Sequence, residues 1–334
     1  MRKFTLFFVA ISYIFIGCSK ESSDSFIPYA GNPANDTSWS ANPPVTAASV
    51  KLFEGLAYSP FTDSFTVSGS ALLKVNANLD LAIPAACVTH LDGTPLLSTD
   101  KVRIEIRHVN KRGDFIRYAR PTTTYGKLME SASAFQVKFY KQNQELAFLP
   151  AKKLFFTLKD PNPVNNEMVY FGNMNPQMPF PIGTNPFFAW MPALDSSFIT
   201  PFVRQDTAGV VTKGYQLFAG KINWINAQLF IDSTLAKTNI TVTLPPNFTN
   251  NNTALFAVVK HQKIVVQLNG DLASRSFFAP NIPVGSSVVL VSLSLIGNQY
   301  YLGFKEITAT QNIISIVNPS ARTKSEINTF LDGL

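Results

Sequence analysis

The chain has 334 residues, a formal net charge of +7, and only 15% charged residues beside 28 phenylalanines. The length allows two domains, and low charge with many aromatic and β-branched residues is typical of an all-β protein outside the cytoplasm. Its basic residues are scattered, whereas a nucleic-acid partner needs a contiguous basic face, so we expect none. The densest basic patches, NKRG at 110–113 and KHQK at 260–263, are interpreted as solvated strand edges.

The first segment has the pattern of a signal peptide. Two positive charges in the first three residues precede an uncharged run from Phe4 to Gly17. As a helix this run would be about 21 Å long, which is too short for a bilayer core of about 30 Å. We therefore predict a signal peptide over residues 1–17.

This run ends in Phe-Ile-Gly-Cys at residues 15–18, which resembles the lipobox of bacterial lipoproteins. That motif usually has Leu where this chain has Phe15. In that family a peptidase cuts before the cysteine, which is then acylated. The resemblance implies that Cys18 anchors the protein in the outer membrane, facing the periplasm or the cell surface. The alternative is a plain secretory signal or a short anchor in which Cys18 has no role.

Residues 18–44 follow the cysteine and are rich in Ser, Asn, Pro and Asp, with few apolar side chains. Such a segment cannot bury enough apolar surface to fold, so we predict a flexible tether between the lipid and the folded part of the protein.

Residues 45–172 read as short strands separated by turns. KVRIEIRHV at 101–109 alternates apolar and charged side chains, which is the pattern of a half-buried strand. Asp92-Gly93 before it predicts a turn, and NKRG after it predicts another. We expect an antiparallel β-sandwich here, with Cys87 as a buried thiol in its core.

Five prolines interrupt this alternation over residues 173–195, which we interpret as a linker between two domains. Four aromatic residues of this segment are candidate binding residues: Phe180, Phe187, Phe188 and Trp190. An exposed aromatic group would stack on a sugar or enter a partner's pocket. The alternative is that these side chains cement the two domains together.

A second β-rich domain is predicted over residues 196–317, followed by one short helix over 318–334. Ser320 is the expected N-cap of this helix, and Gly333 is its expected stop. Trp224 falls on a predicted strand, where a core position is favoured over a ligand platform. The fold class predicted from the whole sequence is all-β, with two antiparallel sandwiches and a C-terminal helix.

Five stretches carry a resemblance to a known family: VSGSALLKVNANLDLAIPAACVTHLDGTPL at 67–96, KVRIEIRHV, TTTYGKLMESASAFQVKFYKQNQELAF at 122–148, GKINWINAQLF at 220–230, and LGFKEIT at 302–308. They resemble uncharacterised lipoproteins of the Bacteroidota. The first domain of those proteins is similar to the β-sandwich of ankyrins, netrin receptors and zonula occludens proteins. The resemblance covers about residues 65–310 and rests on a diffuse pattern, since it contains no catalytic signature. It implies an envelope protein and does not specify its partner.

The sequence shows no signature of catalysis. The motifs HExxH, GxSxG, GxxxxGK[ST] and GxGxxG are absent, and no second His or Cys stands at ligand spacing from His90, His108 or His261. A triad or a carboxylate pair assembled from distant residues stays open. We therefore expect no metal and no cofactor.

The leading interpretation is a non-enzymatic, lipid-anchored envelope protein that acts in binding, adhesion or envelope assembly. Its expected partners are the membrane, through the anchor, and a glycan or an envelope protein. The alternatives are a carbohydrate-binding module and a glycan or peptidoglycan hydrolase. A hydrolase would need two carboxylates about 5 to 9.5 Å apart across a cleft.

Overall fold

The computed structural model describes residues 32–124, 127–173, 188–231 and 234–334. The chain divides into two units, Met1–Asp36 and Thr37–Leu334. Only residues 32–36 of the first unit are described, and they contain the 3₁₀ turn η1, Pro33–Asn35. The predicted signal peptide and Cys18 lie outside the described residues. The second unit contains all of the described sheets.

Strand makes up 52% of the structure and helix 9%, which confirms the all-β class predicted from the sequence. Within the described residues, paired strands are antiparallel, apart from one parallel pair described below. None of the helices in the described ranges combines the length and the apolarity needed to cross a bilayer.

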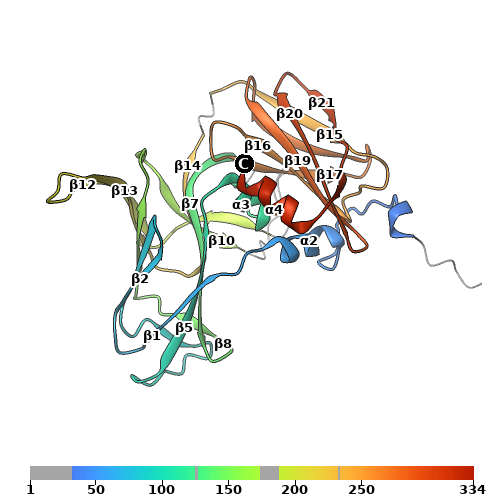
Figure 1. Cartoon of the computed structure of the whole chain (residues 1–334). Helices are drawn as coiled ribbons and strands as arrows, with labels where there is room; N and C mark the ends of the chain where they lie inside the picture. Colours follow the sequence, from blue (N-terminus) through green and yellow to red (C-terminus); the bar gives the residue numbers. More distant parts are fainter. Residues whose placement is uncertain (1–31, 125–126, 174–187, 232–233) are drawn as a thin grey trace, which may run out of the picture. The chain divides into compact units, whose positions relative to one another are not determined.

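Two sheets form the first sandwich (Figure 1). The larger one has nine strands in the order β1-β5-β7-β14-β10-β11, with three more attached beside this path. Its strands are β1 (Phe61–Thr66), β4 (Val88–His90), β5 (Lys101–Val109), β6 (Thr123–Thr124), β7 (Lys127–Lys141), β8 (Gln144–Phe148), β10 (Met168–Asn173), β11 (Ala189–Pro192) and β14 (Asn223–Phe230).

The five-stranded sheet has the order β12-β13-β9-β3-β2. Its strands are β2 (Ala71–Asn76), β3 (Leu79–Ile83), β9 (Leu154–Lys159), β12 (Phe198–Gln205) and β13 (Val211–Ala219). One core lies between the two sheets, where Phe135 of β7 and Phe156 of β9 stack with ring centroids 4.7 Å apart. Cys87 is fully buried in this core, as predicted.

The second sandwich is one eight-stranded sheet in the order β21-β15-β18-β17-β16-β19-β20-β22, in which β15 and β21 are parallel. Its strands are β15 (Lys237–Thr243), β16 (Thr253–Val259), β17 (Val265–Asp271), β18 (Ser276–Pro283), β19 (Ser287–Ile296), β20 (Gln299–Thr308), β21 (Ile313–Ile316) and β22 (Ser320–Arg322). Strands from both halves of the sheet contribute to one core, for example Val242 of β15 and Leu290 of β19. The sheet therefore folds over on itself.

The domain boundary predicted at 173–195 is wrong. Within the described part of this segment, β11 pairs with β10 in the nine-stranded sheet. The next three strands also belong to the first sandwich, since β12 pairs with β13, β13 with β9, and β14 lies between β7 and β10. The first sandwich thus extends to Phe230, and the second begins at Lys237. Proline misled the prediction because β11 is an edge strand, where Pro192 is tolerated.

The predicted tether, residues 18–44, is also too long at its C-terminal end. Trp39 packs on Phe277 of β18, with ring centroids 5.2 Å apart. The side chain of Asn250 accepts a hydrogen bond from the Ser40 N–H at 3.1 Å and donates one to the Ser40 C=O at 2.6 Å. Polar composition misled here because asparagine side chains hold this backbone together with the packing of a single aromatic side chain, Trp39.

The predicted C-terminal helix is confirmed as α4, Lys324–Asp332, with Gly333 at its C-cap. Its N-cap is Thr323, and Ser320 belongs to β22 instead. The Thr323 Oγ1 accepts from the Glu326 N–H at 3.2 Å, and the Glu326 carboxylate accepts from the Thr323 N–H at 2.7 Å. This reciprocal pair is a capping box, which fixes where the helix starts.

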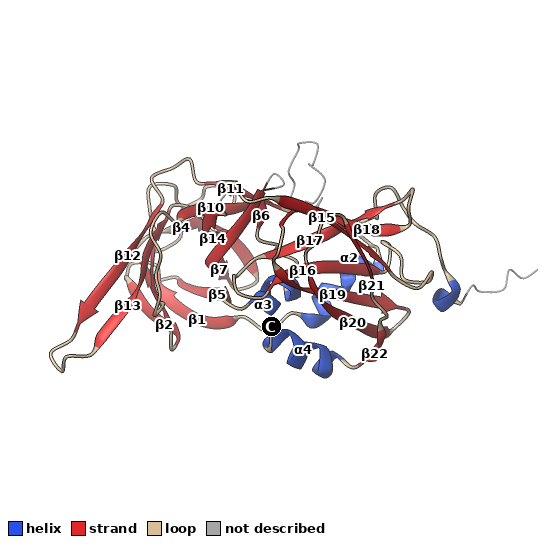
Figure 2. Ribbon diagram, turned by 90° about the horizontal axis from the view of Figure 1, so that it is seen from above, coloured by secondary structure: helices blue, strands red, loops and turns tan. Residues whose placement is uncertain are grey.

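Two further helices were not predicted: α2, Ala48–Leu56, and α3, Arg112–Arg117. α3 was read as a turn because it is only six residues long. Figures 1 and 2 show all three helices gathered where the two sandwiches meet. α3 and α4 touch so closely that a Cβ at Gly113 would lie 1.8 Å from the carbonyl oxygen of Leu331. Only glycine allows this approach.

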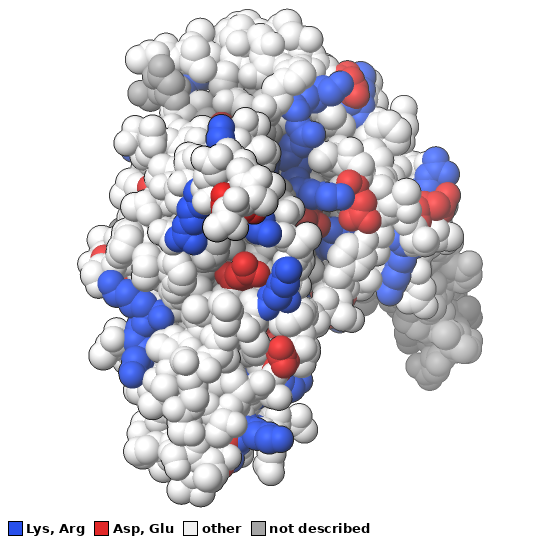
Figure 3. Space-filling view, turned by 60° about the vertical axis from the view of Figure 1, so that its left-hand side comes forward, with Lys and Arg blue, Asp and Glu red and all other residues white. Residues whose placement is uncertain are grey.

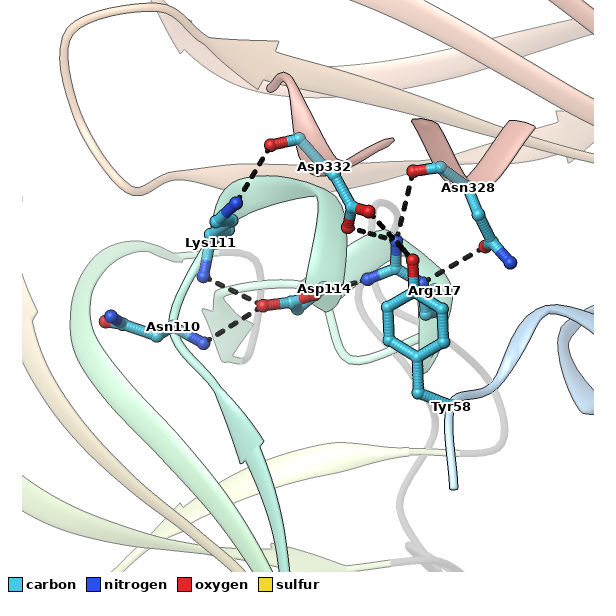
Figure 4. A network of polar contacts seen from close by, with 7 residues as sticks. All are labelled: Tyr58, Asn110, Lys111, Asp114, Arg117, Asn328 and Asp332. Carbon is cyan, nitrogen blue, oxygen red and sulfur yellow. Dashed lines mark hydrogen bonds and ion pairs between the residues drawn. The ribbon is translucent and has the colours of Figure 1, made fainter. Parts of the chain in front are cut away.

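A buried cation joins these helices (Figure 4). Arg117 of α3 is fully buried and forms ion pairs with Asp114 of α3 and with Asp332 of α4, the latter at 2.7 Å. Its Nε donates to Asn328 Oδ1 at 3.3 Å, and its guanidinium lies 4.0 Å from the ring centroid of Tyr58, just after α2. The network therefore ties α3, α4 and the end of α2 together.

We expect Arg117→Met to lower the free energy of unfolding by about 3 kcal/mol, because it preserves packing volume but leaves two carboxylates without their cation. The matched control is Arg103→Met, which removes the half-exposed pair with Glu105 and should cost at most about 1 kcal/mol. Urea unfolding measures both losses. Equal losses in the two variants would show that the Arg117 network does not stabilise the fold.

Candidate binding cleft

The aromatic segment does not form an exposed binding surface at the two positions that the structure describes. Phe188 is 2% exposed and Trp190 is fully buried. Their rings pack edge to face, with centroids 4.7 Å apart, in a third core where the sandwiches meet. The proposed binding role is therefore wrong for these two residues, whose side chains instead pack between the sandwiches, as in the alternative interpretation. Phe180 and Phe187 lie outside the described residues.

Trp224 joins the same core and is 3% exposed, which confirms its predicted core position. Gly172 on the neighbouring strand β10 makes room for it. A Cβ at Gly172 would lie 2.5 Å from the Cβ of Trp224 and 2.6 Å from the ring of Phe188. The aromatic side chains thus lie directly on the backbone of β10.

The two basic patches are only partly solvated: Lys111 and His261 are exposed, whereas Arg112 and Lys263 bond to neighbouring segments. Arg112, in the first patch, donates through Nη1 to the C=O of Val259 at 3.1 Å. Lys263, in the second, donates through Nζ to Asn110 Oδ1 at 3.3 Å and to the C=O of Ala132 at 2.6 Å. Burial lowers the pKa of Lys263. These residues connect β7 and α3 of the first half of the chain to β16 and the turn that follows it in the second.

A cleft lined by described residues lies where β14 begins. β14 starts at Asn223 between β7 and β10. β7 continues past that point to Lys141, whereas the described part of β10 ends at Asn173, level with Asn223. The cleft has a volume of about 650 Å³. Its lining residues are Gln136, Lys138, Phe171, Gly172, Asn173, Met191, Pro192, Leu194, Lys221, Ile222, Asn223 and Trp224.

These residues combine an apolar floor with hydrogen-bonding groups. Phe171 and Trp224 are buried, whereas three amides and two ammonium groups supply the polar part. Arg107 donates to Gln136 Oε1 at 2.7 Å, which fixes the amide of Gln136 on the outer face of the sheet. Lys138 pairs with Glu145 at 2.9 Å, and Lys221 lies over the ring of Phe171, 5.5 Å from its centroid. Such a mixture is typical of small-ligand sites.

Charge is mixed on the face of the protein shown in Figure 3. Figure 3 shows one face on which acidic and basic side chains are interspersed among uncharged residues, with several Lys and Arg side chains gathered along a hollow. The cleft itself contains no carboxylate, because none of its lining residues is Asp or Glu. Two-carboxylate chemistry is therefore not available in this cleft.

His108 and Ser133 resemble a base and a nucleophile, since Nε2 and Oγ lie 2.7 Å apart. Asn76 fixes the direction of this hydrogen bond. Its Oδ1 accepts from the N–H of Asn78, so its NH₂ group faces His108 Nδ1, 2.9 Å away. Nδ1 must then accept, and Nε2 carries the proton and donates to Ser133. Ser133 in turn donates to the C=O of Val109 at 3.3 Å.

This arrangement prevents His108 from accepting the serine proton through Nε2. Burial lowers the pKa of His108 to about 4, with a smaller contribution from the charge of Lys263, so the ring is neutral near pH 7. Burial likewise raises the pKa of the Cys87 thiol to about 11, which suppresses the reactive thiolate. Neither residue lines the cleft.

Glu167, just before β10, is a buried carboxylic acid. Burial raises its pKa to about 8, and the Tyr215 hydroxyl lies 3.4 Å from its Oε1. Its Oε2 is buried and has no hydrogen-bond partner among the residues that the structure describes. Within the same ranges, no group of three or more His, Cys, Asp or Glu residues is arranged to hold a metal ion.

Comparisons with protein-family models, with curated proteins and with solved structures found no match to this chain.

Glu167 makes stability depend on pH in a predictable direction. Between the unfolded pKa of 4.5 and the folded pKa of about 8, the native state holds a proton that the unfolded state has lost. Stability from this group therefore falls as pH rises through that window and is constant above it. We expect Glu167→Gln to remove this fall between pH 6.5 and 8.5, a range above the titration of His108.

Urea unfolding at several pH values checks this expectation, with Glu306→Gln, at an exposed carboxylate, as the control. Identical slopes for the wild-type protein and Glu167→Gln over pH 6.5–8.5 would contradict it.

Proposed function

We propose that this chain is a non-enzymatic, lipid-anchored protein of the cell envelope that binds a glycan in the cleft at the start of β14. Cys18 carries the anchor, and the short polar segment before Thr37 links it to the folded unit. The leader pattern and the resemblance to Bacteroidota lipoproteins support the location. The glycan is held by the amide and ammonium groups of the cleft.

The lining of the cleft is the observation that carries this proposal. It offers hydrogen-bonding side chains from three neighbouring segments of the nine-stranded sheet and its loops, around a half-enclosed space large enough for a small ligand. The absence of Asp and Glu from its lining favours binding over glycoside hydrolysis. The Ser133–His108 pair has the wrong hydrogen-bond direction for a hydrolase and lies outside the cleft.

The binding proposal is tested by filling the cleft. We expect the full chain to bind at least one glycan on an array of neutral polysaccharides, acidic polysaccharides and peptidoglycan fragments. Gln136→Trp places a bulky ring in the cleft and should weaken that binding at least tenfold. Thr62→Trp adds the same ring to an exposed position of β1 in the same sheet and should bind like the wild-type protein.

Absence of binding to every glycan, or equal binding by the two variants, would contradict the proposal. New reducing ends released from a bound glycan would also contradict it, because they would show hydrolysis.

The anchor is tested at Cys18. We expect Cys18→Ala to abolish metabolic labelling with a fatty acid and to release the protein from the membrane fraction, because the acyl chains provide the attachment. Cys87→Ala is the matched control, since Cys87 is a buried thiol. Unchanged labelling of Cys18→Ala would show that the anchor lies elsewhere.

A further inference from the structure

We propose that the ligand of the cleft is an anionic saccharide, a sugar chain that carries carboxylate or phosphate groups, and that Lys221 supplies the main charge contact. This inference rests on the proposed function and adds the chemical class of the ligand. It follows from three features of the cleft, which are its covered aromatic rings, its excess of hydrogen-bond donors and the unbalanced charge of Lys221.

The aromatic residues of the cleft offer no face for a sugar to stack on. Trp224 is 3% exposed and Phe171 is 8% exposed. The guanidinium of Arg120 lies 4.7 Å from the ring centroid of Trp224, and the rings of Phe188 and Trp190 pack against it edge to face. Neutral sugar chains that bind through stacking need an open aromatic face. Recognition in this cleft therefore depends on hydrogen bonds and charge.

The polar groups of the cleft are dominated by donors. Lys138 and Lys221 can only donate, and the Gln136 Oε1 already accepts from Arg107. The amides of Asn173 and Asn223 also line the space, whereas carboxylate acceptors are absent from the lining. A ligand rich in acceptor oxygens, and above all in charged ones, complements such a surface.

The charge of the cleft is only partly balanced. Lys138 has Glu145 as its partner at 2.9 Å. Lys221 contacts the ring of Phe171, and no ion pair joins it to a carboxylate in the part of the chain that the structure describes. Arg107 adds a further positive charge beside Gln136. An anionic group bound here would face a net positive surface that is within reach of several donors.

A matched pair of ligands tests this inference. Trigalacturonate and its methyl ester carry the same ring hydroxyls, but the ester lacks the negative charges. With the full chain in isothermal titration calorimetry, we expect trigalacturonate or a phosphorylated oligosaccharide of similar length to bind at least tenfold more tightly than the ester. The comparison between the carboxylated and the phosphorylated ligand identifies the anionic group. Raising the salt concentration from 20 to 200 mM should weaken the binding, because exposed charges are screened.

Variants locate the contact. Lys221→Gln should weaken binding of the anionic ligand about five- to tenfold and leave the ester unchanged. Lys213→Gln, at an exposed lysine of β13 outside the cleft, should bind like the wild-type protein. Equal affinity for acid and ester, or no effect of Lys221→Gln, would overturn the inference. A neutral glycan whose binding is lost in Gln136→Trp would overturn it while leaving the proposed function intact.

Discussion

The contact on which the rest of the structure depends is the third core, where Phe188, Trp190 and Trp224 pack between the two sandwiches. It forms on the outer face of the nine-stranded sheet, a face that would otherwise be solvated. Gly172 allows the rings to approach the backbone of β10, and side chains of β16 and β19 cover them from the other side. Each buried aromatic side chain removes a large apolar area from water, so a few such residues contribute a large share of the free energy that stabilises a core. The two sandwiches are therefore parts of one compact unit and are not independent domains joined by a linker.

This core also determines where the cleft lies. The second sandwich and the helices cover the nine-stranded sheet over Ala134 and Tyr170. β14 lies between β7 and β10 and begins at Asn223, so the cleft at its start lies at the margin of the covered area. Trp224 takes part in both regions, since it belongs to the core and also lines the cleft. The packing of the third core thus positions the hydrogen-bonding groups of the adjoining cleft.

The sequence predicted local structure well and long-range pairing poorly. Alternation in KVRIEIRHV correctly placed Val102, Ile104 and Ile106 in the core, since strand period alone determines that pattern. The partner of β14 was beyond such reasoning, because pairing between residues 127–141 and 223–230 depends on contacts far apart in the chain. Proline density at 173–195 was read as a boundary, although the described end of that segment is an edge strand.

In the candidate site, too, local features were predicted from the sequence and long-range contacts were not. The apolar surroundings of Cys87 and Trp224 in the sequence predicted their burial. Packing of Phe188 and Trp190 between the sandwiches was one of the two alternatives that the sequence left open. The cleft was missed because Gln136, Asn173 and Lys221 come from separate segments and form no motif. The capping box at Thr323 was a local signal that the prediction placed three residues early, at Ser320.

Differential scanning calorimetry of the full chain tests most directly the claim that one shared core joins the two sandwiches. We expect a single transition whose calorimetric and van't Hoff enthalpies agree. We also expect that Trp190→Ala, which empties a fully buried site in the shared core, splits this transition in two or lowers the temperature of the whole transition. Two separate transitions in the wild-type protein, with only one of them altered by Trp190→Ala, would contradict the account.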